Sequence, residues 1–205
     1  MESETFKERN VMDQYLRALS DAALKICEGN AAEAKSIITK GYPFKPIAKE
    51  KRSYSDLQQM EQFFRDGFVD RYFGTRLINP GMLRVFSELY PDAFPYQAHW
   101  KTDECHMAYW DYQPTIDHSV PIAQGGSNDP SNWATTSMKG NLAKRNFTLE
   151  QLHWHLHPAG NVAEWDGLSK DFICIVDQDT DLLKINAISR WYKATKEVLP
   201  RFIVE

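Results

Sequence analysis

The stretch from Thr115 to Asn146 places the strongest constraint on how this chain folds. It reads TIDHSVPIAQGGSNDPSNWATTSMKGNLAKRN, and it opens with a β-prone run that Pro121 brings to an end. Residues 123–132 are rich in turn formers, and residues 133–137 are β-prone again. The residues that follow can open a helix. The order of these signals predicts a strand, a polar loop, a second strand and a helix.

Helical signals dominate the rest of the sequence. Apolar residues recur at helical spacing in several runs, and the candidate N-caps include Asn30, Ser55 and Thr148. Thr148 and Gln151 also have the spacing of a capping box, and Asn79 precedes a proline that suits a helix start. We therefore expect a fold that is mainly α with one small ββα unit, an α+β class. The helical runs are expected at 3–40, from Ser53, over 80–90, over 149–157, over 168–176 and around 188–192.

The chain divides into four expected segments. Residues 1–40 form an N-terminal helical hairpin, and residues 41–98 form a linker and a helical flank, with the basic, proline-containing stretch 41–52 as the linker proper. Residues 99–150 hold the ββα unit, and residues 151–205 form a C-terminal helical flank. Hydrophobic residues make up 42% of the chain, which is enough for a packed core and argues against wholesale disorder.

Two apolar stripes at helical spacing are expected to pack against other parts of the protein. The stripe of the helix after Pro80 is expected in the core. The stripe of the first helix predicts packing or dimerisation by the N-terminal hairpin. The first set is Leu83, Phe86 and Leu89, and the second is Val11, Tyr15, Leu16, Leu19 and Ala23.

Composition excludes several classes of protein. Cys27, Cys105 and Cys174 stand far apart with no C-x-x-C pair, so neither a cysteine zinc site nor a redox pair is indicated. The sparse cysteines, the charged N-terminus without a signal-peptide pattern and the lack of a long apolar run predict a cytoplasmic protein outside the membrane. The net charge of −4 argues against nucleic-acid binding over the whole surface, but it leaves room for a local basic groove.

The opening stretch also contains the side chains that phosphodiester hydrolysis requires. Asp117 offers a hard oxygen ligand suited to Mg²⁺, and the amide oxygen of Asn141 offers a second. His118 is a candidate general base, because histidine titrates near neutral pH. Asn132 ends the loop, and its side chain is expected to bond to the backbone and keep His118 aimed. Trp133 is expected to pack the unit onto the helices.

Three cations nearby are candidates for binding a nucleic-acid backbone. In the helix that begins after residue 137, Asn141, Lys144 and Arg145 are expected to share one face, at spacings i, i+3 and i+4. Lys144 and Arg145, together with Lys139, would then face phosphates beside the metal.

The remaining histidines are interpreted as structural. His99 and His106 lie among aromatic residues and are expected to pack. His153 and His157 are four residues apart, as zinc-binding pairs on helices are, but no third ligand accompanies them in the sequence. We therefore favour a surface or packing role for this pair over a second metal site.

The residues His118, Asn132 and Asn141, in this order, resemble the HNH endonucleases in the variant whose third position is asparagine. The resemblance implies a ββα-metal fold in which one Mg²⁺ or Mn²⁺ binds Asp117 and Asn141. It further implies that Asp117, His118, Asn132 and Asn141 form the catalytic set and that the products carry 5′-phosphate and 3′-hydroxyl ends. The flanks, among them residues 68–91, are similar to bacterial HNH proteins without a four-cysteine knuckle, which implies that helical and aromatic flanks replace that zinc site.

Three hypotheses about function follow from the sequence. The first is a metal-dependent endonuclease that hydrolyses DNA, in bacterial defence or restriction. The second is a partner-controlled effector nuclease that acts on RNA, and the third is a non-catalytic ββα module that binds DNA. In each, the N-terminal helices are a candidate surface for a protein partner or for homodimerisation.

Overall fold

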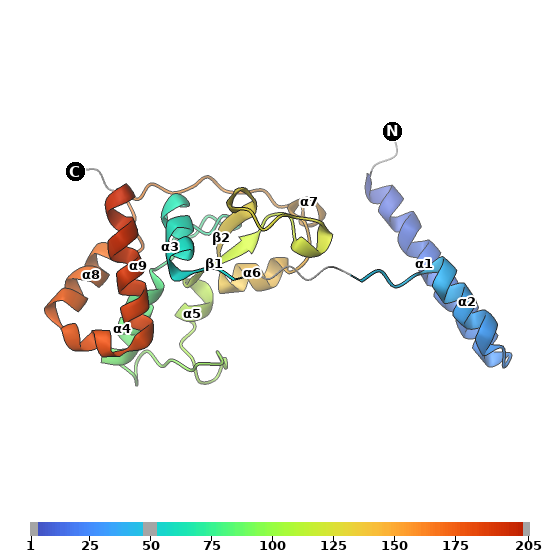
Figure 1. Ribbon diagram of the computed structural model, residues 1–205, viewed down its shortest axis with the longest axis horizontal. Coiled ribbons are helices and arrows are strands. Elements are labelled where there is room, and N and C mark those ends of the chain that lie inside the picture. The colour runs from blue at the N-terminus through green and yellow to red at the C-terminus, as the bar shows by residue number, and fades with distance from the viewer. Residues whose placement is uncertain (1–3, 47–52, 203–205) are drawn as a thin grey trace. The chain divides into compact units, whose positions relative to one another are not determined.

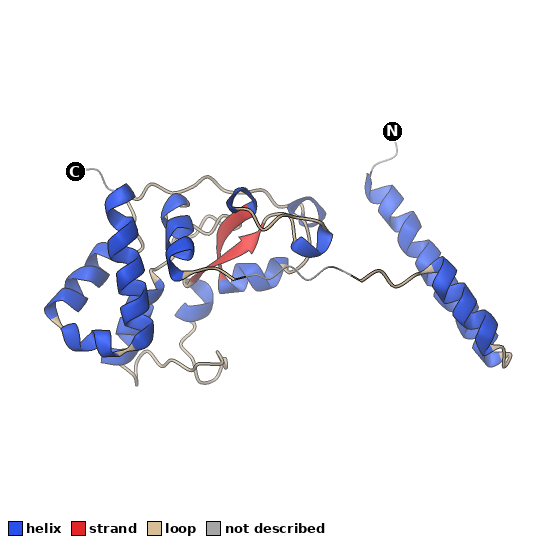
Figure 2. Cartoon of the chain, viewed as in Figure 1, coloured by secondary structure: helices blue, strands red, loops and turns tan. Residues whose placement is uncertain are grey.

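A computed structural model describes residues 4–46 and 53–202, without the side chains of residues 4–10. The chain consists of two compact units, Met1–Ala48 and Lys49–Glu205. Helices predominate, and the described residues contain one small two-stranded antiparallel sheet, which lies in the larger unit (Figures 1 and 2). The expected mainly helical class is confirmed. Part of the expected linker, residues 47–52, lies outside the described residues.

The smaller unit is the expected helical hairpin, made of α1 (Glu4–Cys27) and α2 (Ala31–Gly41). Asn30 caps α2, because its side chain accepts a hydrogen bond from the backbone N–H of Glu33. The two helices contact each other where Gly41 lies against Ala18, and the rings of Tyr15 and Tyr42 stack with their centroids 4.1 Å apart.

The larger unit contains seven α-helices and two strands among its described residues. The expected capping box is present at Thr148, and the expected cap Ser55 forms a capping box as well. Asn79 accepts a hydrogen bond from the backbone N–H of Gly81 at the start of its helix. No helix in the described ranges has the length and apolarity needed to cross a membrane. The elements are α3 (Asp56–Arg65), α4 (Pro80–Leu89), α5 (Ala108–Asp111), β1 (Pro114–His118), β2 (Trp133–Ser137), α6 (Met138–Lys144), α7 (Leu149–Leu152), α8 (Ser169–Gln178) and α9 (Asn186–Phe202), with 3₁₀ turns at Ile122–Gln124, Pro130–Asn132 and Thr180–Lys184.

Two expected helices end earlier than the sequence pattern suggests. Helix α7 stops at Leu152, because His153 adopts a left-handed conformation with φ of 55°. Helix α6 stops at Lys144, and Arg145 has φ of 49°. The expected helical face shared by His153 and His157 is therefore wrong, and so is the inclusion of Arg145 in the α6 face.

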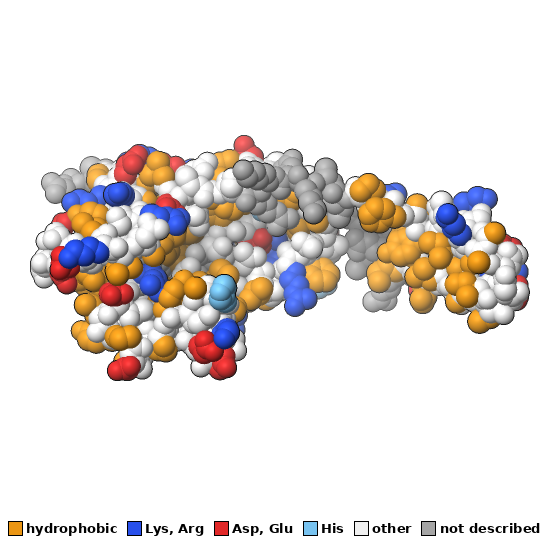
Figure 3. Space-filling view, turned by 60° about the horizontal axis from the view of Figure 1, so that its bottom comes forward, with side chains coloured by type: hydrophobic (Ala, Val, Ile, Leu, Met, Phe, Trp, Pro, Cys, Tyr) orange, Lys and Arg blue, Asp and Glu red, His pale blue; other side chains and the backbone are white. Residues whose placement is uncertain are grey.

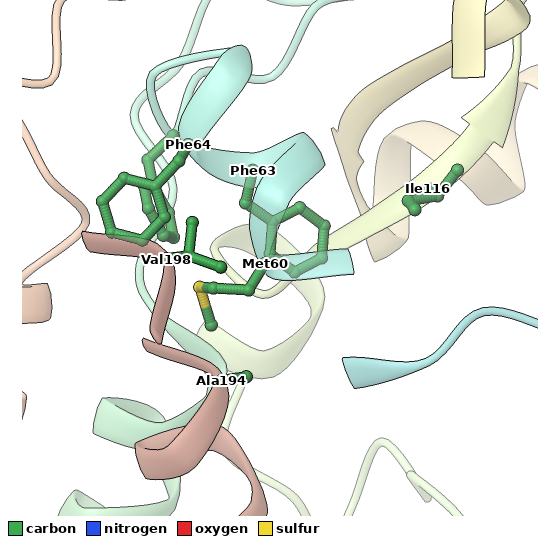
Figure 4. Close-up of a cluster of buried hydrophobic side chains, with 7 residues drawn as sticks. Met60, Phe63, Phe64, Ile116, Ala194 and Val198 are labelled. Carbon is green, nitrogen blue, oxygen red and sulfur yellow. The ribbon is translucent and has the colours of Figure 1, made fainter. Parts of the chain in front are cut away.

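The main hydrophobic core holds the small sheet against the helices. Met60, Phe63 and Phe64 of α3 pack with Val198 of α9, and Ile116 of β1 joins the same cluster (Figure 4). A two-stranded hairpin is marginal by itself in water, so this burial is what makes β1 and β2 persist. A second cluster joins α4, α8 and α9, and its members include Val85, Phe172, Val176 and Ile188.

The expected core stripe of α4 is only partly buried. Leu83 is fully buried and Phe86 packs at the edge of the second cluster, but 43% of Leu89 is exposed. Helix α4 ends at Leu89, and the chain turns away at Tyr90, so the last residue of the stripe lies beyond the packed surface.

Two buried carboxylates complete the outer edge of β2. Asp66 accepts a hydrogen bond from the Thr135 backbone N–H at 2.8 Å, and Asp70 accepts one from the Ser137 N–H at 2.8 Å. The Arg71 N–H donates to the Thr135 carbonyl at 2.8 Å. The loop that follows α3 thus satisfies polar groups that a third strand would otherwise pair.

Asp70 has further bonds that tie its own loop to the sheet. Its Oδ1 accepts from the backbone N–H groups of Tyr72 and Phe73 and from the Thr136 hydroxyl. Both carboxylate oxygens therefore face donors, and the residue is fully buried.

We predict that Asp70→Asn destabilises the protein by about 2 to 3 kcal/mol, since hydrogen bonds to charged groups contribute this much and an amide NH₂ must face a backbone donor. Urea unfolding followed by circular dichroism measures the effect. Asp92→Asn, at an exposed position, is the matched control and should change stability by less than about 0.5 kcal/mol. Equal effects of the two substitutions would contradict the role given to Asp70.

Candidate functional site

The site is built at the end of strand β1. This strand pairs antiparallel with β2, so that Asp117 lies opposite Ala134 and His118 lies opposite Trp133. Side chains alternate between the two faces of a strand, and burial along β1 alternates accordingly. His118 therefore shares the core-facing side with Ile116, while Asp117 points to the other face.

Asn132 makes the bracing bonds expected of it. Its Oδ1 accepts from the Val120 N–H at 2.9 Å, and its Nδ2 donates to the Val120 carbonyl at 2.8 Å and to the Ser127 carbonyl at 2.9 Å. The Ser119 N–H donates to the backbone carbonyl of Asn132 at 2.8 Å. One side chain thus closes both ends of the polar loop and fixes the backbone directly after His118.

His118 is buried, and its Nε2 already has partners. Only 3% of the residue is exposed. Nε2 lies 2.9 Å from Oδ1 of Asn128 and 3.2 Å from the hydroxyl of Tyr54. An amide oxygen only accepts, so the contact with Asn128 requires a proton on Nε2. For Nε2 to accept a proton, the bond to Asn128 must break and the ring must carry its own proton on Nδ1.

Asp117 binds a buried ammonium group. Nζ of Lys144 lies 2.9 Å from Oδ2 of Asp117 and donates to the carbonyl of His118 at 2.6 Å. Lys144 is fully buried, whereas 12% of the Asp117 side chain is exposed. Lys144 thereby fastens α6 to the end of β1 at both residues of the Asp-His pair.

The same carboxylate oxygen accepts a second bond, from the hydroxyl of Tyr72 at 2.8 Å. Burial, reinforced by the negative charge of Asp117, raises the pKa of Tyr72 far above its ordinary value. The hydroxyl consequently stays protonated and remains a donor. Since both described bonds fall on Oδ2, Oδ1 is the oxygen of Asp117 that a further ligand can approach.

Asn141 lies on helix α6, which follows β2 directly. Ser137 caps the helix by accepting from the Gly140 N–H at 2.9 Å. Gly140 is required here, since a Cβ at this position would lie 2.2 Å from the Thr136 hydroxyl. Asn141 and Lys144 are three residues apart and therefore neighbours on the helix surface. Lys144, the neighbour of Asn141 on this surface, contacts Asp117.

The donor set at this point fits one hard divalent cation. The Oδ1 of Asp117 and the amide oxygen of Asn141 are ligands that Mg²⁺ and Mn²⁺ accept, and such ions commonly complete their shell with water and phosphate oxygens. In the described ranges no group of three or more His, Cys, Asp or Glu side chains stands close enough to hold a metal by itself. The protein would thus supply only part of the shell.

The three cations that were expected to contact phosphates differ in their exposure and in their partners. Lys144 is buried and bound to Asp117, so its expected role at the nucleic-acid backbone is wrong. Arg145 is exposed, just beyond the end of α6. Lys139 is exposed too, but it pairs with Asp111 at 3.1 Å and lies nearly opposite Asn141 around the helix.

Lys139 lines a pocket that is separate from the Asp117 site. The pocket has a volume of about 440 Å³, and its lining includes Phe73, Tyr112 and Ala143. Ala143 follows Lys139 by one helical turn, so this pocket lies along the far flank of α6.

His153 and His157, which the sequence analysis interprets as surface or packing residues, have other contacts than the residues of the site. His153 ends α7, and the ring of His157 lies beside that of His155, with centroids 5.2 Å apart. His157 also accepts a bond from the Arg71 side chain at its carbonyl. These contacts agree with a packing role.

Sequence reasoning missed three side chains that touch the Asp-His pair. Tyr54 stands one residue before the α3 cap, Tyr72 lies in the loop after α3, and Asn128 lies within the polar loop. Only Asn128 is near His118 in sequence, and its residue type there indicates merely a turn. No sequence signal marks the two tyrosines, because tertiary packing brings them to the site.

No protein-family profile, curated protein or solved structure matches this chain. The functional argument therefore depends on the residues and geometry of the site.

We predict that Lys144→Met destabilises the protein by about 3 to 5 kcal/mol, because it leaves the Asp117 carboxylate without its buried partner. Thermal or urea unfolding measures the change. Lys139→Met removes an exposed cation from the same helix and should cost at most about 1 kcal/mol. A stable Lys144→Met protein would show that the pair does not hold α6 to β1.

Proposed function

We propose that this protein is a metal-dependent endonuclease of the HNH type that hydrolyses DNA phosphodiester bonds and leaves 5′-phosphate and 3′-hydroxyl ends. In this proposal Asp117 and Asn141 hold one Mg²⁺ or Mn²⁺, and His118 is the general base. DNA is the partner of the site.

The observation that carries the proposal is the way Asn132 closes the loop between the two strands. Its bonds to Val120 and Ser127 fix the chain directly after His118. This bracing fixes the position of the residue that the proposal assigns as the general base. Asp117 and His118 are adjacent at the end of β1, and Lys144, three residues after Asn141 on α6, contacts Asp117.

Each residue has a chemical role in the proposed reaction. A bound divalent ion would supply charge neutralisation at the scissile phosphate. Tyr72 and Lys144 hold Oδ2 of Asp117 and leave Oδ1 toward that ion. When Asn128 releases Nε2 and the ring carries its proton on Nδ1, the free lone pair of Nε2 can take a proton from the attacking water.

Arg145 is exposed just beyond the end of α6, four residues after Asn141, and is suited to a phosphate of the substrate backbone. Contacts of this kind position a nucleic acid without reading its bases. The proposal therefore assigns no sequence preference to this part of the site.

The test is the nicking of supercoiled plasmid DNA in the presence of Mg²⁺ or Mn²⁺. We expect His118→Ala to lower the rate by at least about 100-fold, the contribution of a general base, and EDTA to abolish cutting. His99→Ala removes an exposed histidine of the same unit and should keep the wild-type rate. Unchanged cutting by His118→Ala would contradict the assigned base.

Substrate class is decided in the same assay by offering linear duplex DNA, single-stranded DNA and RNA, followed by mapping of the ends. We expect cleavage of DNA with 5′-phosphate products. Preferential cleavage of RNA would favour the effector-nuclease hypothesis. DNA binding without cleavage under any ion tested would identify a non-catalytic module and overturn the proposal.

A further inference from the structure

The helical hairpin of the smaller unit carries an uncovered apolar stripe. Met12, Leu16, Leu19, Ala23 and Ile26 of α1 are exposed, and the four larger side chains are exposed by 70%, 67%, 42% and 60% in this order. They are separated alternately by four and three residues, which is the spacing of the contact positions in paired helices. Figure 3 shows hydrophobic side chains gathered over the hairpin.

Helix α2 does not cover this stripe, because it contacts a neighbouring face of α1. Ala18 and Ala22 of α1 and Ala34 of α2 are buried in that contact. A Cβ on Gly41 would lie 2.6 Å from the Cβ of Ala18, so the two helices touch through their smallest residues. The larger apolar side chains are therefore left outside.

The size of the unit indicates that the stripe is covered in the working protein. Chains of about 40 residues rarely stabilise a fold without disulfides, metals or association, and here the buried apolar side chains described are alanines. At about 1.5 Å per residue, the stripe from Met12 to Ile26 is roughly 21 Å long.

The stripe is complementary to itself. If two copies of α1 run antiparallel and cross at Leu19, then Met12 of each copy lies opposite Ile26 of the other. The same arrangement sets the large Leu16 beside the small Ala23, as interdigitating layers require. A two-fold interface needs this reciprocity, in which residue i meets residue j and j meets i.

We propose that the hairpin is a homodimerisation element, in which the stripes of two chains pack antiparallel and the two hairpins form a four-helix bundle. The occupant of the apolar face is a second copy of this chain. The proposal does not depend on nuclease activity.

Light scattering coupled to size-exclusion chromatography of the full chain tests the proposal. We expect a mass of about 47 kDa at micromolar concentrations, twice the 23.7 kDa of one chain. Leu19→Glu should shift the mass to that of one chain. Leu24→Glu is the matched control, because Leu24 is 58% exposed on the same helix but lies roughly a third of a turn from the stripe, and this variant should stay dimeric.

Crosslinking gives a second readout that does not require a destabilised variant. In a Cys27→Ser, Cys174→Ser background, Leu19→Cys should form a disulfide-linked dimer under mild oxidation, and Leu24→Cys should not. A wild-type protein with the mass of one chain would overturn the proposal. The apolar stripe would then have to be covered by another part of the same chain or by another protein. Equal loss of the dimer in Leu19→Glu and Leu24→Glu would overturn it as well.

Discussion

The pairing of the β2 edge with Asp66 and Asp70 is the interaction on which the rest of the larger unit depends. A hairpin of two five-residue strands leaves the backbone N–H groups of its outer edge without partners, and burying them unpaired would be costly. The two carboxylates accept hydrogen bonds from the N–H groups of Thr135 and Ser137. Ser137 then caps α6, so the bonds that complete the sheet also set where the helix begins. The position of Asn141 follows from that start.

The same edge also joins helix α3 to the sheet. Asp66 accepts hydrogen bonds from Gln62 of α3 and from the Thr135 N–H, and it pairs with Arg71 of the loop after α3. Ile116 of β1 packs against the apolar face of α3. Helix α3 therefore holds the sheet both through apolar contacts and through hydrogen bonds to a buried carboxylate.

Local signals in the sequence were sufficient to predict much of the fold. The strand, loop, strand and helix order and the caps at Asn30, Ser55 and Thr148 depend on near neighbours, and all of them are present. The bracing by Asn132 was also predictable, because its partners lie in the same loop. The failures concern contacts between distant segments. Nothing near Lys144 in sequence indicates that Asp117 and Tyr72 bury it, and the left-handed residues that end α6 and α7 are not glycines.

The two proposals assign catalysis to the larger unit and dimerisation to the hairpin. Asp117, His118 and Asn141 stand on a strand and a helix, whereas Asn128 lies in the loop between the strands, and the proposed reaction requires Asn128 to leave Nε2 of His118. Two chains joined through their hairpins would carry two such sites, one for each strand of a duplex.

The most direct test of the proposed site is a crystal structure with Mn²⁺ and a short DNA duplex, read by anomalous scattering. The account predicts a manganese peak between Oδ1 of Asp117 and the amide oxygen of Asn141, with a phosphate beside it and Asn128 moved away from His118. No peak between these side chains, or DNA bound along the Lys139 flank of α6 instead, would contradict it.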